Sequence, residues 1–294
     1  MFVNPFRQQG NWYRGNLHTH TRASDGQASV EERIRQYRNE GYDVLAITDH
    51  GVTSEVADFS TDEMLLLDGV EVSSAASGGA PFYHFVCLNV HPDATVPGSP
   101  SPNDVIAWAK KEGGESLLAH PYWSGNDAQD LLAVHGHVGV EVYNAGCRNI
   151  NKACSSVHWD NMLNKGARTP GIAVDDVHSA EGQGGDLFGG WVMLKMPELS
   201  APAVLEALRT GCHYCSCGPR VLDFGLLEGK AYVQCEPARE VHLMGANWHG
   251  LSCCARGDGL LREAQAEVDA EWKYVRAEVV DAEGRRAWTN PIYL

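Results

Sequence analysis

The chain has 294 residues, with 23 basic and 38 acidic side chains and a formal net charge of -15. Its composition, 44% hydrophobic and 21% charged, is that of a globular protein and excludes the disordered and fibrous classes. Since proteins usually hold a nucleic-acid backbone through a basic face, the acidic balance leads us to expect no long nucleic acid among its partners.

The N-terminal segment MFVNPFRQQGNWYRG lacks the apolar core of a signal peptide, and no run of about 18 apolar residues occurs. We therefore predict a cytoplasmic protein with no membrane partner. Nine cysteines without the spacing of a disulfide-bonded domain indicate free thiols. Cys212, Cys215 and Cys217 form a cluster, but a structural zinc site normally has four ligands and no fourth lies in register.

Aliphatic runs alternate with helical stretches from about residue 12 to 217, which is typical of a mostly parallel α/β domain. The predicted strands are GNLHTH, YDVLAITDH, MLLLDGVEVSS, FYHFVCLNV, ESLLAHP, VGVEVYN, TPGIAVDD and GWVMLKM. Helices are predicted from Ser29 to Asn39 and near 102–112, 152–164 and 200–210. Ser29 and Glu32 have the spacing of a capping box, which marks the start of the first helix.

Helical periodicity largely stops after Gly218-Pro219. Short strand-like pieces separated by turns follow: VLDFGLL, AYVQCEP, REVHLMG, AQAEVDAEW, KYVRAEVVDAEG and NPIYL. We therefore predict two domains, an α/β domain over 1–218 that carries the active site and a small antiparallel, sandwich-like β domain over 219–294.

The motif His18-Thr19-His20, with Asp25 five residues later, is the first candidate for metal binding. Residues i and i+2 of a strand point to the same face, so both imidazoles can reach one metal ion. The alternative is a pair of hydrogen-bonded polar side chains at a strand end.

Further imidazoles and carboxylates follow other aliphatic runs, where a buried strand gives way to a loop. In β/α barrels the C-terminal rim of the strands brings functional side chains together. His84 lies inside a predicted strand and can point inward from the wall. Unpaired buried charges would cost several kcal/mol each, a cost that metal ions remove. The strand-end candidates are His50, Glu71, His120, Asp176 and His178.

The motifs HTHTRASDG, ITDHG, GVEVSS, LLAHP and DDVHS together resemble the PHP (polymerase and histidinol phosphatase) family, whose members include metal-dependent phosphoesterases. The resemblance covers roughly residues 14 to 218. The segment CSCGPR and the tail YVRAEVVDAEGRRAWTNPIYL also look like the subgroup with a small appended β domain.

This resemblance implies a distorted barrel of seven β/α units with two or three divalent metal ions, manganese, zinc or iron, at the strand C-termini. One metal would be held by His18, His20, Glu71 and Asp176. Glu71 would bridge to a second metal, held also by His84 and His120. The third would bind Asp25, His50 and His178.

The chain departs from family members that hydrolyse nucleoside bisphosphates, because only 56 residues separate His120 from Asp176 and leave no room for an inserted helical module. It also carries no fused polymerase, so substrate identity does not transfer. The loops 144–151 and EGQGGDLFGG are candidates for a lid.

The predicted function is hydrolysis of a small phosphorylated metabolite or short nucleotide by a metal-bridging hydroxide, with metals neutralising the phosphate. Glu71 would hold the metals, Asp176 or His178 would protonate the leaving group, and Arg148 is the first candidate to bind the phosphate. Arg22, Arg168 and Arg220 are more typical of surface residues.

Two alternatives remain open at this point: hydrolysis of a carboxylic ester or amide, since hydroxide also attacks carbonyl carbon, and a non-catalytic metal-binding module. Asp49 either orients an imidazole or caps its loop. Glu141 and Asn144 are expected at the edge of the site. Trp159, Trp191 and Trp248 are expected to be packing residues, while the oligomeric state stays open.

Overall fold

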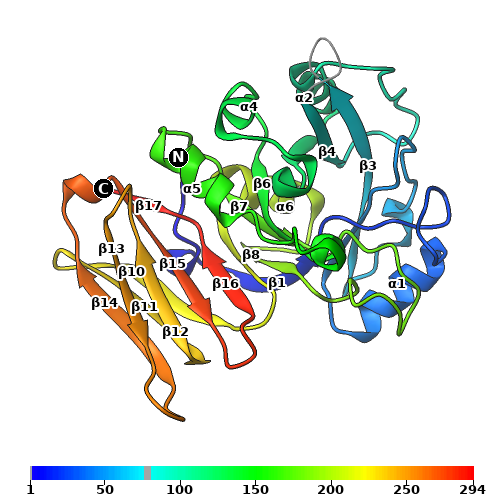
Figure 1. The fold of residues 1–294 in the computed structure, drawn as a ribbon. Coiled ribbons are helices and arrows are strands. Elements are labelled where there is room, and N and C mark those ends of the chain that lie inside the picture. The colour runs from blue at the N-terminus through cyan, green and yellow to red at the C-terminus, as the bar shows by residue number, and fades with distance from the viewer. Residues whose placement is uncertain (1, 76–80) are drawn as a thin grey trace.

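The computed structural model describes residues 2–75 and 81–294. Its first part is a distorted α/β barrel, as predicted, and its last part is rich in β-structure (Figure 1). The barrel strands are β1 Asn11–Asn16, β2 Val44–Ile47, β3 Leu65–Ala75, β4 Phe82–Leu88, β5 Glu115–Leu118, β6 Gly139–Asn144 and β7 Gly171–Val174. They are neighbours in sequence order. Thr19 and Val177, just beyond β1 and β7, form a parallel bridge that joins the two ends of this set.

The distortion of the barrel is concentrated at β3 and β4. β4 runs antiparallel to both of its neighbours, whereas β1 to β3 and β5 to β7 are parallel. Leu65 to Asp68 pair with β2, and Gly69 to Ala75 then pair with β4. The expectation that Glu71 follows the end of its strand is therefore wrong, because the hairpin to β4 extends β3 past it.

The four predicted helices are present as α1 Val30–Asn39, α2 Pro102–Lys111, α5 Ser156–Asn164 and α6 Ala201–Thr210. The capping box of α1 forms as expected: Glu32 N–H donates to Ser29 Oγ, and Ser29 N–H donates to the Glu32 carboxylate. The short helices α3 Pro121–Ser124 and α4 Ala128–Leu132 were not predicted. Single 3₁₀ turns are η1 Pro5–Arg7, η2 Ala57–Phe59, η3 Gly146–Ile150 and η4 Ala270–Trp272.

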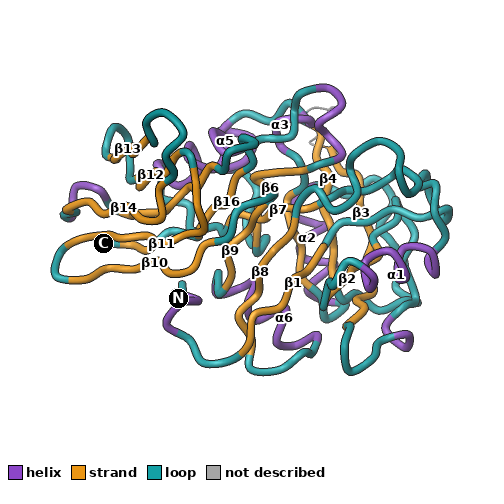
Figure 2. Tube along the Cα trace, turned by 90° about the horizontal axis from the view of Figure 1, so that it is seen from below, coloured by secondary structure: helices purple, strands orange, loops and turns teal. Residues whose placement is uncertain are grey.

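The sheet of the barrel continues into the C-terminal region. From β1 it runs through β8, β9, β16, β15 and β12 to β13, while β10, β11 and β14 form a separate sheet. The two sheets bury a shared cluster that includes Phe224, Val241 and Val279, and Figure 2 shows them lying together at the end away from α1. These strands are β8 Trp191–Met196, β9 His213–Ser216, β10 Val221–Leu227, β11 Lys230–Ala238, β12 Glu240–Met244, β13 Gly250–Cys254, β14 Leu261–Glu267, β15 Tyr274–Val280, β16 Arg286–Thr289 and β17 Ile292–Tyr293. The domain boundary at 218/219 stays a prediction.

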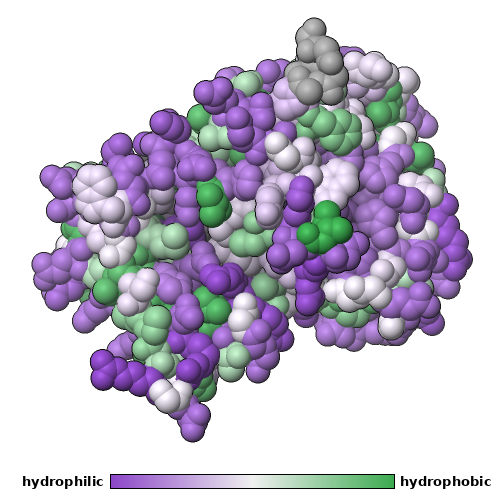
Figure 3. Space-filling view, in the orientation of Figure 1, coloured by the Kyte–Doolittle hydropathy of each residue, from purple (hydrophilic) through white to green (hydrophobic). Residues whose placement is uncertain are grey.

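In the view of Figure 3 hydrophilic residues cover most of the face, and hydrophobic ones lie in small patches. All nine cysteines are free thiols. Trp159 is fully buried, but Trp248 is 84% exposed, so the packing role expected for Trp248 is wrong.

None of the helices in the described residues has the length and apolar character needed to cross a membrane. A cytoplasmic location stays a prediction.

Candidate metal centre

The nine predicted metal ligands meet at one end of the barrel. Seven of them line a cavity of about 390 Å³, and the other two, His18 and His20, are fully buried against Glu71, which is one of the seven. The seven lining residues are Asp25, His50, Glu71, His84, His120, Asp176 and His178. The sequence prediction therefore brought together side chains that are far apart in the chain.

Glu71 lies at the centre of this cluster, and each of its two oxygens faces a different group of imidazoles. Oε2 lies 3.1 Å from His18 Nε2, 3.2 Å from His20 Nε2 and 3.1 Å from His50 Nδ1. Oε1 lies 2.7 Å from His84 Nδ1 and 3.2 Å from His120 Nε2. A carboxylate in this position can bridge two cations.

Asp176 lies against the same two histidines, with Oδ1 3.2 Å from His18 Nε2 and 3.1 Å from His20 Nε2. His18, His20, Glu71 and Asp176 together place ligand atoms within 4.8 Å of one another. Asp176 and His120 both have positive φ, 51° and 25°, in the region that non-glycine residues rarely adopt. Such backbone strain is typical of functional sites, where the surrounding structure holds it.

A second group forms around Asp25, whose carboxylate lies 3.4 Å from His178 Nε2 and 3.7 Å from His50 Nε2. These residues and His20 also place ligand atoms within 4.8 Å of one another. Asp25 reaches the cavity because the chain turns tightly at Gly26, where a Cβ would lie 2.5 Å from the His20 backbone.

The donor set fits divalent cations by a direct test on its buried atoms. Glu71 Oε2, Asp176 Oδ1 and His84 Nδ1 are buried and make no hydrogen bond of good geometry, although nitrogen and oxygen atoms face one another at close range. Orphaned buried polar atoms are costly. A cation shared between imidazole nitrogens and carboxylate oxygens satisfies all of them at once.

The electrostatics of the cluster are dominated by its carboxylates. Burial lowers the pKa of His18, but Asp176, Glu71 and Glu141 outweigh burial and hold that pKa well above its ordinary value. In the same way, the carboxylates of Asp176 and Glu71 at close range overcome burial and raise the pKa of His20 to about 9. The pKa of Glu71 is held well below its usual range, since the histidines outweigh its burial. The cluster therefore attracts positive charge strongly.

Residues around the cluster orient its ligands. Glu141 Oε1 lies 2.7 Å from His18 Nδ1, and Oε2 accepts from the His120 backbone N–H and from Asn144 Nδ2. Asn144 also donates to Asp176 Oδ2. Asp49 does not contact an imidazole; its carboxylate accepts bonds from Thr21 and Ser24 and so caps the loop.

The loop that carries Asp176 is anchored from below by buried groups that the sequence analysis missed. Asp175 accepts hydrogen bonds from Tyr37 and from the backbone N–H groups of Phe188 and Gly190. Arg33, fully buried on α1, donates to the His20 carbonyl. A buried arginine and tyrosine on the inner face of a predicted helix were the available signal, because a helix facing only the core carries apolar residues there.

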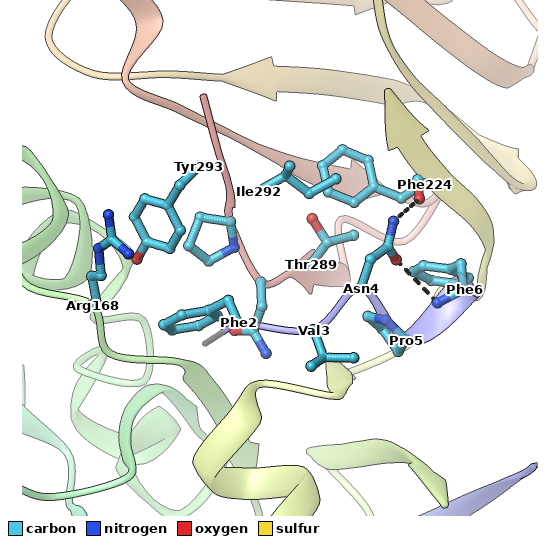
Figure 4. Close-up of a pocket in the computed structure, with 12 residues that line it drawn as sticks. Phe2, Val3, Asn4, Pro5, Phe6, Arg168, Phe224, Thr289, Ile292 and Tyr293 are labelled. Carbon is cyan, nitrogen blue, oxygen red and sulfur yellow. Dashed lines mark hydrogen bonds between the residues drawn. The ribbon is translucent and has the colours of Figure 1, made fainter. Parts of the chain in front are cut away.

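None of the four candidate arginines lies among the residues that line the metal cavity. Arg148 donates to the Gly185 carbonyl and lines a neighbouring cavity. Arg168 lies in a distant cavity, where its guanidinium is 4.5 Å from the centre of the Tyr293 ring (Figure 4). Arg22 pairs with Glu32 at the surface. The phosphate-binding role of Arg148 stays a prediction, without direct support from its position.

Trp123 is a further residue of the site that the sequence analysis missed. It lines the metal cavity, is 41% exposed, and its ring centre lies 4.9 Å from that of His120. The signal was an aromatic pair placed directly after the strand-end motif LLAHP. Trp123 supplies a flat apolar wall beside the ligands.

Comparison with known proteins agrees with this site. Residues 16–78 match the PHP domain family, and no curated protein matches the chain. A crystal structure of a two-domain protein from Bacteroides vulgatus, described as containing a predicted PHP-like metal-dependent phosphoesterase, is 15% identical, with a TM-score of 0.55 and coverage of 96% of this chain and 95% of that one. The two-part architecture therefore has a solved counterpart.

Two further solved structures are similar over part of the chain. An amidohydrolase from Chromobacterium violaceum with bound sulfate and no metal is 19% identical, with a TM-score of 0.45 and coverage of 58% of this chain and 89% of that one. Endonuclease Q, in complex with a 27-mer duplex substrate carrying an abasic lesion, is 10% identical, with a TM-score of 0.48 and coverage of 68% and 57%.

The expectation that long nucleic acid is excluded is wrong and is corrected here. Endonuclease Q is one of the structural neighbours, and that protein is solved in complex with a DNA duplex. The physical reason is that net charge describes the whole surface, whereas bound cations set the potential inside one cleft. The charge of -15 therefore does not exclude a nucleic-acid substrate. The match of residues 16–78 to the PHP domain family agrees with the motifs and the barrel, and the fold of the chain is similar to that of a protein described as containing a predicted PHP-like metal-dependent phosphoesterase.

Proposed function

We propose that this chain is a metal-dependent phosphoesterase whose substrate is a small phosphorylated metabolite or a short nucleotide. The observation that carries the proposal is the position of Glu71, whose two oxygens face separate groups of imidazoles at 2.7 to 3.2 Å. Two or three divalent cations, manganese, zinc or iron, suit histidine and carboxylate ligands of this kind.

Bound cations would supply Lewis-acid charge and activate water as the nucleophile. The residues of the chain hold and orient the reacting groups. Glu71 and Asp176 keep the imidazoles in place, and Glu141 fixes the ring of His18. Asn144 donates a hydrogen bond to Asp176 Oδ2, and Asp176 Oδ1 faces the imidazoles of His18 and His20. Neither carboxylate oxygen of Asp176 is therefore directed at a leaving group.

His178 is the better placed of the two candidate proton donors. Its Nδ1–H donates to the Asp176 carbonyl at 2.9 Å, and its side chain is 34% exposed at the cavity. Nε2 is therefore the nitrogen that faces the cavity contents. In this proposal the neutral ring binds a cation through Nε2, or the doubly protonated ring passes its Nε2 proton to the leaving group and returns to the neutral form.

The charge of the cavity favours a phosphate over a neutral ester or amide. Its lining includes four carboxylates, from Asp25, Glu71, Asp176 and Asp186, and no arginine. Three divalent cations outweigh four carboxylates and two balance them, so the cavity loaded with three cations carries net positive charge without an arginine. That charge suits the non-bridging oxygens of a phosphate ester.

The experiment is elemental analysis of the purified protein combined with a hydrolysis screen. Wild type, Glu71→Gln and the matched surface variant Glu63→Gln are compared on phosphate monoesters, diesters, 3',5'-bisphosphates, duplex DNA with an abasic site, and carboxylic esters and amides. We expect two to three metals per chain, phosphate release by wild type and Glu63→Gln, and loss of both metal and release in Glu71→Gln.

Other results would overturn the proposal in distinct ways. Full metal content with turnover of only carbonyl substrates would make the chain a different metal hydrolase. Turnover of duplex DNA but of no small substrate would move the substrate class. Unchanged activity in Glu71→Gln would remove the proposed centre from the reaction.

A further inference from the structure

A second cavity, of about 560 Å³, lies beside the metal cavity and is lined by four arginines that come from three separate regions of the chain. They are Arg14 on β1, Arg148 on η3, and Arg285 and Arg286 at the turn between β15 and β16. Glu40 and Glu283 are the acidic residues in its lining. In a chain with a net charge of -15, this excess of arginine is local and opposite in sign to the whole.

The four arginines differ in whether a carboxylate neutralises them. Arg285 pairs with Asp281 and Glu283, and Arg286 pairs with Glu278. Arg14 and Arg148 have no carboxylate within ion-pair distance among the residues that the structure describes. Two guanidinium groups at one cavity are therefore left without an ion-pair partner.

Arg14 is held rigidly in this unpaired state. Its guanidinium carbon lies 4.0 Å from the centre of the Tyr42 ring and 4.0 Å from that of Trp191, so it is sandwiched between two aromatic faces. One nitrogen donates to the Tyr42 hydroxyl at 3.1 Å, while Nε is buried and makes no hydrogen bond. A guanidinium fixed by stacking loses little conformational freedom when it binds an anion.

Arg148 connects this cavity to the metal centre. It belongs to the turn η3 Gly146–Ile150, in which Gly146, Cys147 and Asn149 line the metal cavity while Arg148 lines the arginine cavity. The facing loop is divided in the same way, since Gly185 lines the arginine cavity and Asp186 lines the metal cavity. These two short segments therefore separate the cavities, and Arg148 bonds one segment to the other.

We propose that the arginine cavity is a binding site for a phosphate group, distinct from the metal centre and using Arg14 and Arg148 as its ligands. A doubly charged phosphate matches two unpaired guanidinium groups, each of which can donate two parallel hydrogen bonds. The group is either inorganic phosphate from solution or a second phosphate on the substrate. Binding does not depend on turnover, so the site goes beyond the function proposed above.

The test is chemical modification of arginines by phenylglyoxal on the metal-loaded protein, read out residue by residue by peptide mass spectrometry. Inorganic phosphate is compared with chloride at equal ionic strength. We expect phosphate to slow modification of Arg148 and to leave Arg168, which lies in another cavity, unchanged. Equal rates for Arg148 in phosphate and chloride, or equal slowing at Arg168, would overturn the proposal.

A second measurement uses Arg148→Ala, with Arg168→Ala as the matched control. Loss of charge-assisted hydrogen bonds weakens phosphate binding roughly tenfold or more, so protection of Arg14 by phosphate should shift to higher concentration only in Arg148→Ala. If the site holds a second phosphate of the substrate, Arg148→Ala raises KM for a 3',5'-bisphosphate and not for a monophosphate. If it holds free phosphate, KM is unchanged. Unaltered protection of Arg14 in Arg148→Ala would exclude Arg148 as a ligand. If the enzyme turns over none of these substrates, the phenylglyoxal experiment alone decides whether the site binds phosphate.

Discussion

The metal centre and strand β9 both bury histidine side chains completely, yet the two surroundings act on them in opposite directions. His18, His20 and His213 are each 0% exposed. Burial lowers the pKa of His213 to about 4, whereas carboxylates around His18 and His20 overcome burial and raise their pKa. Burial alone therefore makes a neutral structural histidine, and burial beside carboxylates makes a site for cations.

The largest expected effect tests the role of the carboxylates in this contrast. Replacing Asp176 by Asn removes the charge that faces His18 and His20 but keeps the size of the side chain. We expect turnover to fall roughly a thousandfold, or about 4 kcal/mol of barrier, together with metal content. Steady-state kinetics and elemental analysis measure both. Asp58→Asn on exposed η2 is the control, and an Asp176→Asn enzyme with full metal and full turnover would contradict the prediction.

The next effect concerns His213, whose ring nitrogens lie 3.2 Å and 3.3 Å from the carbonyls of Ala207 and Gly171. The pKa of His213 is about 4 in the folded chain, below its ordinary value of about 6.5. Between these two pH values the ring therefore takes up a proton only in the unfolded chain. The free energy of unfolding should therefore fall by roughly 3 kcal/mol as pH drops from about 6.5 to about 4.

Chemical denaturation of EDTA-treated protein at several pH values measures this loss without a contribution from metal release. His213→Gln should have a smaller dependence on pH over the same range, whatever its stability at pH 7. An identical pH dependence in wild type and variant would show that His213 does not titrate as its burial predicts.

The smallest effect concerns Glu141, which touches His18 through Oε1 and holds the His120 backbone through Oε2. Glu141→Gln should weaken metal affinity about 10- to 100-fold, because partners that orient a ligand have effects of this size. Competition with a chelator measures the affinity, with Glu63→Gln as control. An unchanged affinity would mean that the orientation of His18 is set by packing alone.

The sequence predicted those barrel strands well that are continuous aliphatic runs, such as Val44–Ile47, which is buried throughout. The first strand, predicted as GNLHTH, was misplaced: β1 is Asn11–Asn16, and His18 and His20 lie beyond its end. The sequence singled out the candidate metal ligands because they follow or interrupt such aliphatic runs. It did not predict α3 or α4, which have four and five residues and are too short to show a period. Strand β13 was also missed, since its residues alternate between partial and full exposure.

The surroundings of the ligands were harder to predict than the ligands themselves. The direction in which the Arg148 side chain points depends on the turn η3, and only tertiary contacts such as its bond to the Gly185 carbonyl define that turn. Glu141 was recognised as peripheral, but its pairing with His18 joins positions 123 residues apart. Trp248 was expected to pack because tryptophan is usually buried, and the turn between β12 and β13 instead leaves it in solvent.

The pairing of β16 with β9 has a consequence for how the chain can be shortened. Ala287, Trp288 and Thr289 hydrogen-bond along the free edge of β9, and the Trp288 ring lies 5.6 Å from that of Tyr143 on the barrel. A fragment ending at residue 218 would leave that edge open and Tyr143 uncovered. Open, unpaired edges invite association between chains. The edge of β9 is therefore covered by β16 and the strands that follow it in the sheet. A soluble fragment ending at residue 218 would need those strands supplied as a separate chain.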